Sequence, residues 1–195
     1  MTALVLFREI DVSDAEKILK WRRQSRVTEF LTTDVGDNLS AQKNWVRASY
    51  AKPGYYHWIF QLNGVDAGIL NVSDFDPTQG VTSWGYYVGE YSFFGLGAMI
   101  PPYLYNWLFR FVGISKIHVE VFSTNHLVLR MHSHHGYIRM PRNDRTIVKA
   151  GQEVALQSLE LTASDWLKQR DAERFIADFP TNRWSARPSS LGASN

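Results

Sequence analysis

The feature that most constrains this chain is an aromatic, β-prone run that breaks into a glycine-rich turn and then into a helical pattern. The run covers residues 84–88, the turn covers 92–98, and the helical pattern covers 103–112. A helix that follows such a turn leaves its first backbone N–H groups without intrahelical partners, and its dipole favours negative charge there. The segment therefore predicts an anion-binding turn, although an ordinary tight turn would have the same local sequence.

The two glycines of this turn have separate expected roles. Gly95 can adopt a positive φ, and Gly97 lets the backbone approach a ligand with no Cβ in between. The spacing fits neither Gly-x4-Gly-Lys-Ser/Thr nor Gly-x-Gly-x-x-Gly, which are the phosphate-binding patterns of the common nucleotide folds. A different kind of anion site is therefore expected.

The composition predicts a single globular domain. The chain has 195 residues, of which 45% are hydrophobic, and this is enough for a full core. Its formal net charge of +2 gives no field that would favour nucleic acid, and the lack of cysteine excludes disulfides, a thiolate nucleophile and cysteine-ligated metals. The apolar runs fall far short of the ~20 residues that span a membrane, and the N-terminus lacks the apolar segment of a signal peptide. We therefore expect a cytoplasmic protein with no nucleic-acid or membrane partner.

The hydrophobic pattern predicts a mixed α/β sheet. Helices are expected to begin near Ser13 and Ser40, and Asn63-Gly64 is a hairpin turn. The strands on either side of the helix at 103–112 need a crossover connection and should lie parallel. Further helices are expected over 125–134 and 162–175, and strands over 4–7, 56–62, 65–72, 81–89, 116–122, 137–140 and 154–161. The expected fold is one domain over residues 1–175, a mostly antiparallel sheet of about seven strands flanked by helices, with a polar, flexible tail over 176–195.

At this level of detail the chain resembles the GCN5-related N-acetyltransferases (GNAT) over residues 4–162. The family's pyrophosphate loop, Gln/Arg-x-x-Gly-x-Gly/Ala, corresponds to residues 92–97, with Ser92 in place of the basic or amide residue. The family's later block, an Asn followed by a helix and Gly-Phe, corresponds to Asn125 and Gly136-Tyr137. The Trp21-Arg22-Arg23 block and the strand at 116–121 are similar to the branch that contains the flagellin-sugar acetyltransferases of the pseudaminic acid pathway. The ribosomal-protein N-terminal acetyltransferases share the spacing from Asn to Gly.

The resemblance implies a fold, a reaction and a co-substrate. The parallel strand pair would splay around an acyl-CoA site, and acetyl-CoA would donate its acetyl group to a primary amine by direct attack in a ternary complex, without a metal. The implied acceptor is a small molecule, the 4-amino group of a UDP-linked deoxy amino sugar, and the protein would be a monomer or homodimer. Two alternatives stay open: a protein N-terminal acetyltransferase, and a non-catalytic CoA-binding module.

The resemblance also implies a set of donor-binding residues. A backbone N–H at Val88 or Gly89 would hold the oxyanion. Asn125 would hold a pantetheine amide, and its alternative role is an N-cap. The residues of the pyrophosphate loop complete the set: Ser92, Phe93, Phe94, Gly95, Leu96, Gly97 and Ala98.

Two side chains are candidates for proton transfer. Glu120 lies on the polar side of an alternating strand and could serve as the base; alternatively it is a structural carboxylate paired with an arginine. His132 lies twelve residues later, where the sugar-acetylating relatives carry a tyrosine acid. As an imidazolium it could protonate the thiolate, or it could simply be a helix-end histidine.

Acceptor binding is predicted at an arginine cluster and an aromatic strand. Arg22, Arg23 and Arg26 suit a diphosphate because a guanidinium is a planar fork of donors, although a solvated helix end would look the same. Tyr86 could stack on a sugar or a uracil base. The histidines from His126 to His135 do not have a spacing that converges on a metal, so no metal site is expected.

Overall fold

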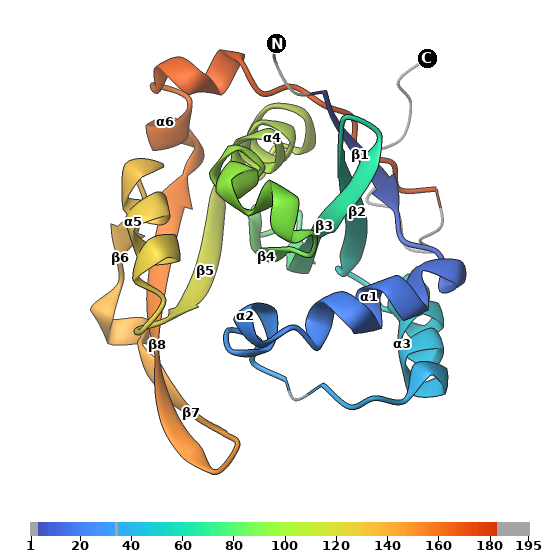
Figure 1. The fold of residues 1–195 in the computed structure, drawn as a ribbon. Coiled ribbons are helices and arrows are strands. Elements are labelled where there is room, and N and C mark those ends of the chain that lie inside the picture. The colour runs from blue at the N-terminus through green and yellow to red at the C-terminus, as the bar shows by residue number, and fades with distance from the viewer. Residues whose placement is uncertain (1–3, 34, 183–195) are drawn as a thin grey trace.

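The computed structural model describes residues 4–33 and 35–182, which form one α/β fold. Its eight-stranded sheet has the order β1-β2-β3-β4-β5-β8-β6, and β7 pairs with β8 outside this path (Figure 1). Only β4 and β5 pair in parallel, so the predicted mixed, mostly antiparallel sheet is confirmed. The strands are β1 (Val5–Glu9), β2 (Tyr56–Leu62), β3 (Val65–Asp76), β4 (Val81–Val88), β5 (Lys116–Phe122), β6 (Ile138–Arg139), β7 (Arg145–Lys149) and β8 (Gln152–Thr162).

Helices cover both faces of the sheet. The α-helices are α1 (Ala15–Arg22), α2 (Ser25–Thr28), α3 (Leu39–Ala51), α4 (Pro101–Asn106), α5 (His126–His134) and α6 (Ala163–Trp166). A π-helical segment, Trp107–Val112, continues α4, and short 3-10 helices cover Val12–Asp14, Tyr91–Met99, Pro141–Asn143 and Arg170–Glu173. None of the helices in the described part of the chain is long and apolar enough to cross a membrane.

The two faces of the sheet have separate cores because neighbouring residues of a strand point to opposite sides. On one face, Trp58, Leu70 and Trp84 pack with α4 and the π-helical segment. On the other face, Ile59 and Ile69 pack with residues of α1 and α3. This second layer covers the sheet near β2 and β3, and the side chains of β4 and β5 on the same face are mostly polar.

Several local predictions are confirmed. Asn63 and Gly64 both have positive φ, 52° and 80°, as the hairpin turn between β2 and β3 requires. Asn125 is the N-cap of α5, and Gly136 follows that helix with φ 86°. The first α-helix begins at Ala15, close to the start expected near Ser13, and a 3-10 helix, Val12–Asp14, precedes it. The Asp11 side chain caps this 3-10 helix by accepting the backbone N–H of Ser13.

The glycine-rich turn has a different conformation from the one expected. Residues Tyr91–Met99 form a 3-10 helix, and neither Gly95 nor Gly97 has the positive φ that would require glycine. The chain then enters α4, with Pro101 and Pro102 in its first turn, where a missing N–H costs no helical hydrogen bond. The helix predicted over 103–112 is thus a short α-helix followed by the π-helical segment.

The C-terminal third also differs in detail. β7 forms in the basic stretch between the strands expected over 137–140 and 154–161, which the sequence pattern predicted to be a loop. The helix predicted over 162–175 is limited to α6 and a short 3-10 helix. Part of the predicted tail is packed: the ring of Phe179 is buried and stacks on Phe7 at 4.1 Å, and the carbonyl of Pro180 accepts the indole N–H of Trp58. The rest of that tail, 183–195, lies outside the described residues.

Candidate functional site

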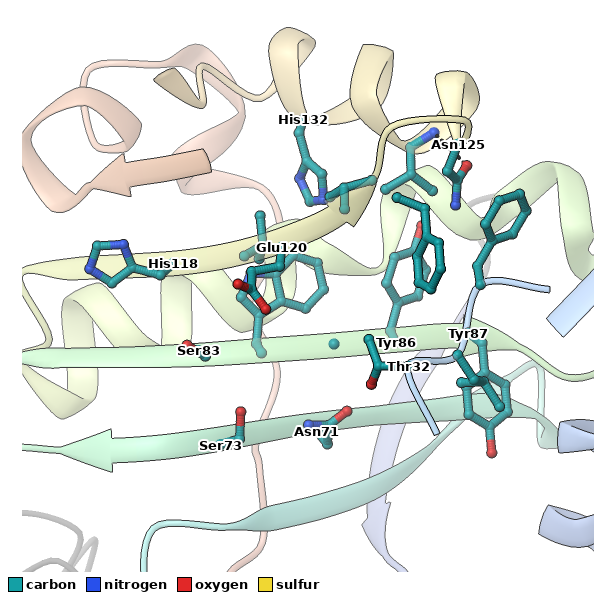
Figure 2. A pocket seen from close by; sticks show the side chains of 18 of the residues that line it. Thr32, Asn71, Ser73, Ser83, Tyr86, Tyr87, His118, Glu120, Asn125 and His132 are labelled. Carbon is teal, nitrogen blue, oxygen red and sulfur yellow. Dashed lines mark hydrogen bonds between the residues drawn. The ribbon is translucent and has the colours of Figure 1, made fainter. Parts of the chain in front are cut away.

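A cleft lies where β4 and β5 separate (Figure 2). The two strands pair only over Val81–Ser83 and Lys116–His118, although they continue to Val88 and Phe122. The space that opens between them has a volume of about 420 Å³. The cleft is lined by the polar residues Thr32, Asn71, Ser73, Asp74, Ser83, His118, Glu120, Asn125 and His132, together with Phe30, Leu31, Trp84, Gly85, Tyr86, Tyr87, Val119, Val121, Phe122 and Val128.

A row of polar side chains crosses the sheet at this cleft. Ser73 of β3 is opposite Ser83 of β4, which is opposite His118 of β5, which is opposite Glu160 of β8. The Nδ1 atom of His118 lies 3.6 Å from a carboxylate oxygen of Glu160. Sequence reasoning missed Ser73, Ser83 and Glu160, because the row exists only once the strand registers are known.

Glycine at position 85 keeps this surface open. A Cβ on Gly85 would lie 3.1 Å from Oδ1 of Asn71, its partner across the β3–β4 ladder. That distance is tighter than an ordinary van der Waals contact, so the missing side chain leaves room for the Asn71 amide. Figure 2 shows Asn71 and Ser73 on β3 beside Ser83 on β4.

Glu120 faces the cleft but is already paired. The guanidinium of Arg145 donates to both of its carboxylate oxygens, each at 2.6 Å, in the two-pronged geometry that binds carboxylates most specifically. Hydrogen bonding to Glu120 raises the pKa of Arg145. This is the ion pair that the sequence left open as the alternative to a catalytic base, and Arg145 was missed because β7 was expected to be a loop.

His132 lies on the opposite wall of the cleft and is buried. Its ring contacts Trp84 and Tyr137, and its Nδ1 atom has no hydrogen-bond partner in the described part of the chain. Burial, and then the charge on His135, lower the pKa of His132 to about 3. The ring is therefore neutral near pH 7, which disagrees with the imidazolium that the sequence suggested.

Tyr86 reaches the cleft from β4. Its hydroxyl donates to the sulfur of Met131 at 3.2 Å, and its ring stacks on Trp84 with centroids 5.6 Å apart. Burial raises the pKa of Tyr86, so the hydroxyl stays protonated. Asn125 also lines the cleft, and its Oδ1 accepts the backbone N–H of Val128. The N-cap role of Asn125 is thus present, and the side chain still borders the cleft.

The predicted donor loop lies at the end of β4, outside the residues that line the cleft. Gly97 is buried, and a Cβ there would lie 3.0 Å from Val88, whereas a Cβ on Gly95 would meet nothing within 4 Å. The N–H of Gly89 donates to the carbonyl of Ala67 at 2.8 Å, which removes it from the expected set of free oxyanion donors. The rest of the loop, Ser92, Phe93, Phe94, Leu96 and Ala98, belongs to the same 3-10 helix.

The three arginines of the predicted cluster do not converge on one ligand. The guanidinium of Arg26 donates to the carbonyls of Val88 and Gly89, at 2.7 and 2.6 Å, and so fixes the end of β4. Arg22 donates to Gln42 and Thr33 in a second cavity, and Arg23 is exposed. Arg26 therefore has a packing role, and Arg22 alone lies in a separate pocket.

One wall of the cleft is held by a lysine. Lys149, at the end of β7, donates from Nζ to the carbonyls of Glu29 and Leu31 at 2.9 and 2.6 Å and also to that of Thr28. These bonds connect the β7–β8 hairpin to the chain just before Thr32.

Within residues 4–33 and 35–182, no cluster of three His, Cys, Asp or Glu side chains could hold a metal ion.

The burial of His132 predicts a stability change with pH. The unfolded state binds a proton near pH 6.5 and the folded state only near pH 3, so this contribution is complete above pH 6.5 and is lost as the pH falls toward 3. Between pH 6 and 5 the slope approaches about 1.4 kcal/mol per pH unit for each such histidine. Urea unfolding at pH 7.5, 6 and 5 should show this loss of unfolding free energy, with a smaller slope against pH for His132→Leu.

His57, whose pKa burial lowers to about 4, makes a similar contribution to the pH dependence, which should remain in the variant. An unchanged slope in His132→Leu would contradict the neutral, buried state.

Comparison with known proteins identifies the family. The family model of the acetyltransferase (GNAT) domain matches residues 5–138 of this sequence. Spermidine N-acetyltransferase from Vibrio cholerae, solved in complex with CoA and spermine, superposes with a TM-score of 0.73 at 10% identity, over 84% of this chain and 98% of that one. A GNAT-family acetyltransferase from Streptococcus pneumoniae gives 0.59 at 18% identity, over 82% and 99%. A domain from Methanocaldococcus jannaschii DSM 2661 gives 0.63 at 17% identity, over 82% and 100%.

The structural neighbours establish the fold, and the family model adds the reaction. No curated protein matches the sequence. The family model covers well over half of the chain and includes β4, the loop after it, β5 and α5, which are the elements around the cleft. The chain therefore belongs to the GNAT family and is an acetyl-CoA-dependent N-acetyltransferase.

Proposed function

We propose that this enzyme acetylates the primary amine of a small molecule. The acceptor would lie along Ser73, Ser83 and His118 beside the β4–β5 cleft, a surface that we call the polar groove. The observation that supports this most strongly is the row of Ser73, Ser83 and His118, which borders the space where the two strands separate. The cleft offers an apolar wall to the acyl donor, and the row offers hydrogen bonds to an acceptor.

The donor's place follows from the order of the elements. The cleft between β4 and β5 is open toward the end of β4, where the segment Tyr91–Met99 begins. We propose that the pantetheine arm of acetyl-CoA lies in the cleft beside Tyr86 and Asn125, and that its pyrophosphate lies against residues 92–98. Gly95 has open space around its Cα, which suits a close approach of the backbone to phosphate oxygens.

The chemistry needs a base on the acceptor side of the cleft. An ammonium must first lose a proton. The amine nitrogen then forms a bond to the carbonyl carbon, the bond from that carbon to sulfur breaks, and the thiolate takes up the second proton that the nitrogen releases as the amide forms. We propose Glu120 as the proton acceptor, directly or through a water molecule, because its carboxylate is turned into the groove (Figure 2). His132, being neutral, is proposed to hydrogen-bond the donor and not to supply the proton as an imidazolium.

The acceptor's class follows from the charges near the groove. Asp74 and Glu120 line the cleft, and Glu160 lies beside His118; carboxylates suit a protonated amine. Glu120 also pairs with Arg145, and Glu160 with Lys116, so Asp74 is the one of the three without a cationic partner among the described residues. The spermidine acetyltransferase among the structural neighbours is an example of an amine-acetylating enzyme with this fold. The UDP-amino sugar inferred from the resemblance has weaker support, because Arg26 is bound to backbone carbonyls and Arg22 lies in a separate pocket.

An acceptor panel tests the proposal. Purified enzyme with acetyl-CoA should acetylate at least one small primary amine from a set of polyamines, amino acids and UDP-amino sugars, measured by release of free CoA and by the mass of the product. N-terminal peptides serve as the competing class. Turnover confined to peptides, or no turnover of any amine together with tight CoA binding, would overturn the small-molecule proposal.

The donor loop makes a separate prediction. Gly95→Val should raise the KM for acetyl-CoA about tenfold with an unchanged Tm, because the new side chain enters open space that the phosphates need. Gly97→Val is the matched contrast: it should lower the Tm, because its Cβ would already press on Val88 at 3.0 Å. Steady-state kinetics and thermal unfolding of both variants distinguish these effects. An unchanged KM in Gly95→Val would place the pyrophosphate elsewhere.

The base makes another prediction. Glu120→Gln should lower kcat about 10²-fold with little change in the KM for acetyl-CoA, as expected on loss of a general base. Arg145→Gln removes the same ion pair but keeps the carboxylate, so it should keep most of the wild-type kcat. Equal losses of kcat in Glu120→Gln and Arg145→Gln would assign the ion pair a structural role and would contradict Glu120 as the base. A wild-type rate in Glu120→Gln together with a large loss in His118→Asn would move the role of base to His118.

A further inference from the structure

A second cavity, which we call the α1–α3 pocket, lies between the end of α1 and the start of α3. It has a volume of about 310 Å³ and is lined by Arg22, Thr33, Asn38, Gln42 and Trp45, among others. It is distinct from the β4–β5 cleft, because Thr32 lines the cleft whereas the next residue, Thr33, lines this pocket. Between α2 and α3, residues 30–32 thus line the cleft, and Thr33, Val35 and Gly36 line this pocket.

Arg22 provides a charge in this pocket that no carboxylate neutralises within the described residues. Its guanidinium donates to two neutral oxygens, the Gln42 amide at 3.2 Å and the Thr33 hydroxyl at 3.1 Å. It also lies 5.7 Å from the centroid of the Trp45 ring, which holds its position. An arginine fixed by neutral groups keeps its attraction for an anion.

Gln42 supplies the second observation. The residue is 5% exposed, and its Nε2 atom has no hydrogen-bond partner among the residues that the structure describes. The amide orientation is set by Arg22: exchanging the amide's oxygen and nitrogen would bring two donors together, so the nitrogen must be the group without a partner. A buried donor left unsatisfied costs on the order of 1–3 kcal/mol, and a bound acceptor would remove that cost.

The start of α3 adds the positive end of a helix dipole. The helix is 13 residues long, and the side chain of its N-cap, Asn38, accepts the backbone N–H of Ala41. The positive end of the helix dipole therefore faces a pocket that both Asn38 and Ala41 line. The guanidinium, the amide nitrogen and the helix start all favour negative charge.

We infer that the α1–α3 pocket binds a small oxyanion, a carboxylate or a phosphate group, through Arg22 and Gln42 at the start of α3. The anion is either an acidic group of the acceptor or a free effector, since both offer the same chemistry. Because the chain from α2 to α3 borders the cleft as well, a bound anion would also order the cleft wall at Leu31 and Thr32. The binding itself does not depend on the proposed acceptor and can be tested without turnover.

The binding test uses inorganic phosphate and acetate on the full chain at constant ionic strength. In ¹H–¹⁵N spectra, the side-chain amide of Gln42 and the indole N–H of Trp45 should shift in a saturable way with at least one of the two anions. Arg22→Ala should weaken binding about tenfold or more, because charge-assisted hydrogen bonds are lost. Arg23→Ala is the matched control: it removes an adjacent, exposed arginine that does not line the pocket, and it should bind as the wild type does.

A second variant keeps the inference falsifiable if Arg22→Ala folds poorly. Gln42→Leu should weaken the binding of phosphate or acetate, because it removes the buried Nε2 donor. An anion affinity in Gln42→Leu equal to that of the wild type would make Gln42 purely structural. The absence of a saturable shift with either anion, or equal affinities in Arg22→Ala and Arg23→Ala, would overturn the inference.

Kinetics then identify the source of the anion. With an acceptor that turns over, competition between phosphate and that acceptor would assign the pocket to the acceptor's own acidic group. A change in kcat without competition would assign it to a free effector. Both patterns support a functional site and should be lost in Arg22→Ala, whereas saturating anion with no effect on either constant would overturn a role in the reaction.

Discussion

The cleft, and the contacts around it, depend on the short ladder between β4 and β5. Parallel strands joined by a crossover helix can continue a hydrogen-bonded ladder along their whole length, but here the ladder ends after Ser83 and His118. Beyond these residues, the separated strands must have their ends fixed by other groups. Arg26 binds the carbonyls at the end of β4, and β8 pairs with β5 along the whole of that strand. The cleft is thus a gap within one sheet, held open by contacts on both sides.

The same contacts explain the unequal use of the charged residues. Arg26 donates hydrogen bonds to the backbone carbonyls of Val88 and Gly89, and Lys149 donates to the carbonyls that follow α2. Carbonyl groups that lack ladder or helix partners need donors, and long cationic side chains supply several at once. Within the described part of the chain, Arg22 bonds neutral side chains and no carboxylate, which is why the second cavity is the stronger candidate for an anion.

Much of the fold could be predicted from the sequence because its determinants are local. The alternation of β5, the Asn63-Gly64 turn and the Asn125 cap depend on neighbouring residues, and all three are present. The features that were missed depend on contacts distant in sequence. β7 was expected to be a loop because its basic residues show no apolar alternation, yet its pairing with β8 creates the ion pair of Arg145 with Glu120. The conformation of the glycine turn and the packing of Phe179 are set by tertiary contacts in the same way.

The electrostatic layout of the cleft limits where a proton can move. The groups that lie deep in it, His132 and Tyr86, are kept neutral by burial, because a charge there would lose its hydration without gaining a partner. The ion pairs stand at the rim: Glu120 with Arg145, and Glu160 with Lys116 and near His118. An ammonium approaching along the row of Ser73, Ser83 and His118 meets carboxylates before it meets the apolar wall. Deprotonation at the rim would therefore precede attack in the cleft, since the neutral amine enters a low-dielectric space at less cost than its charged form.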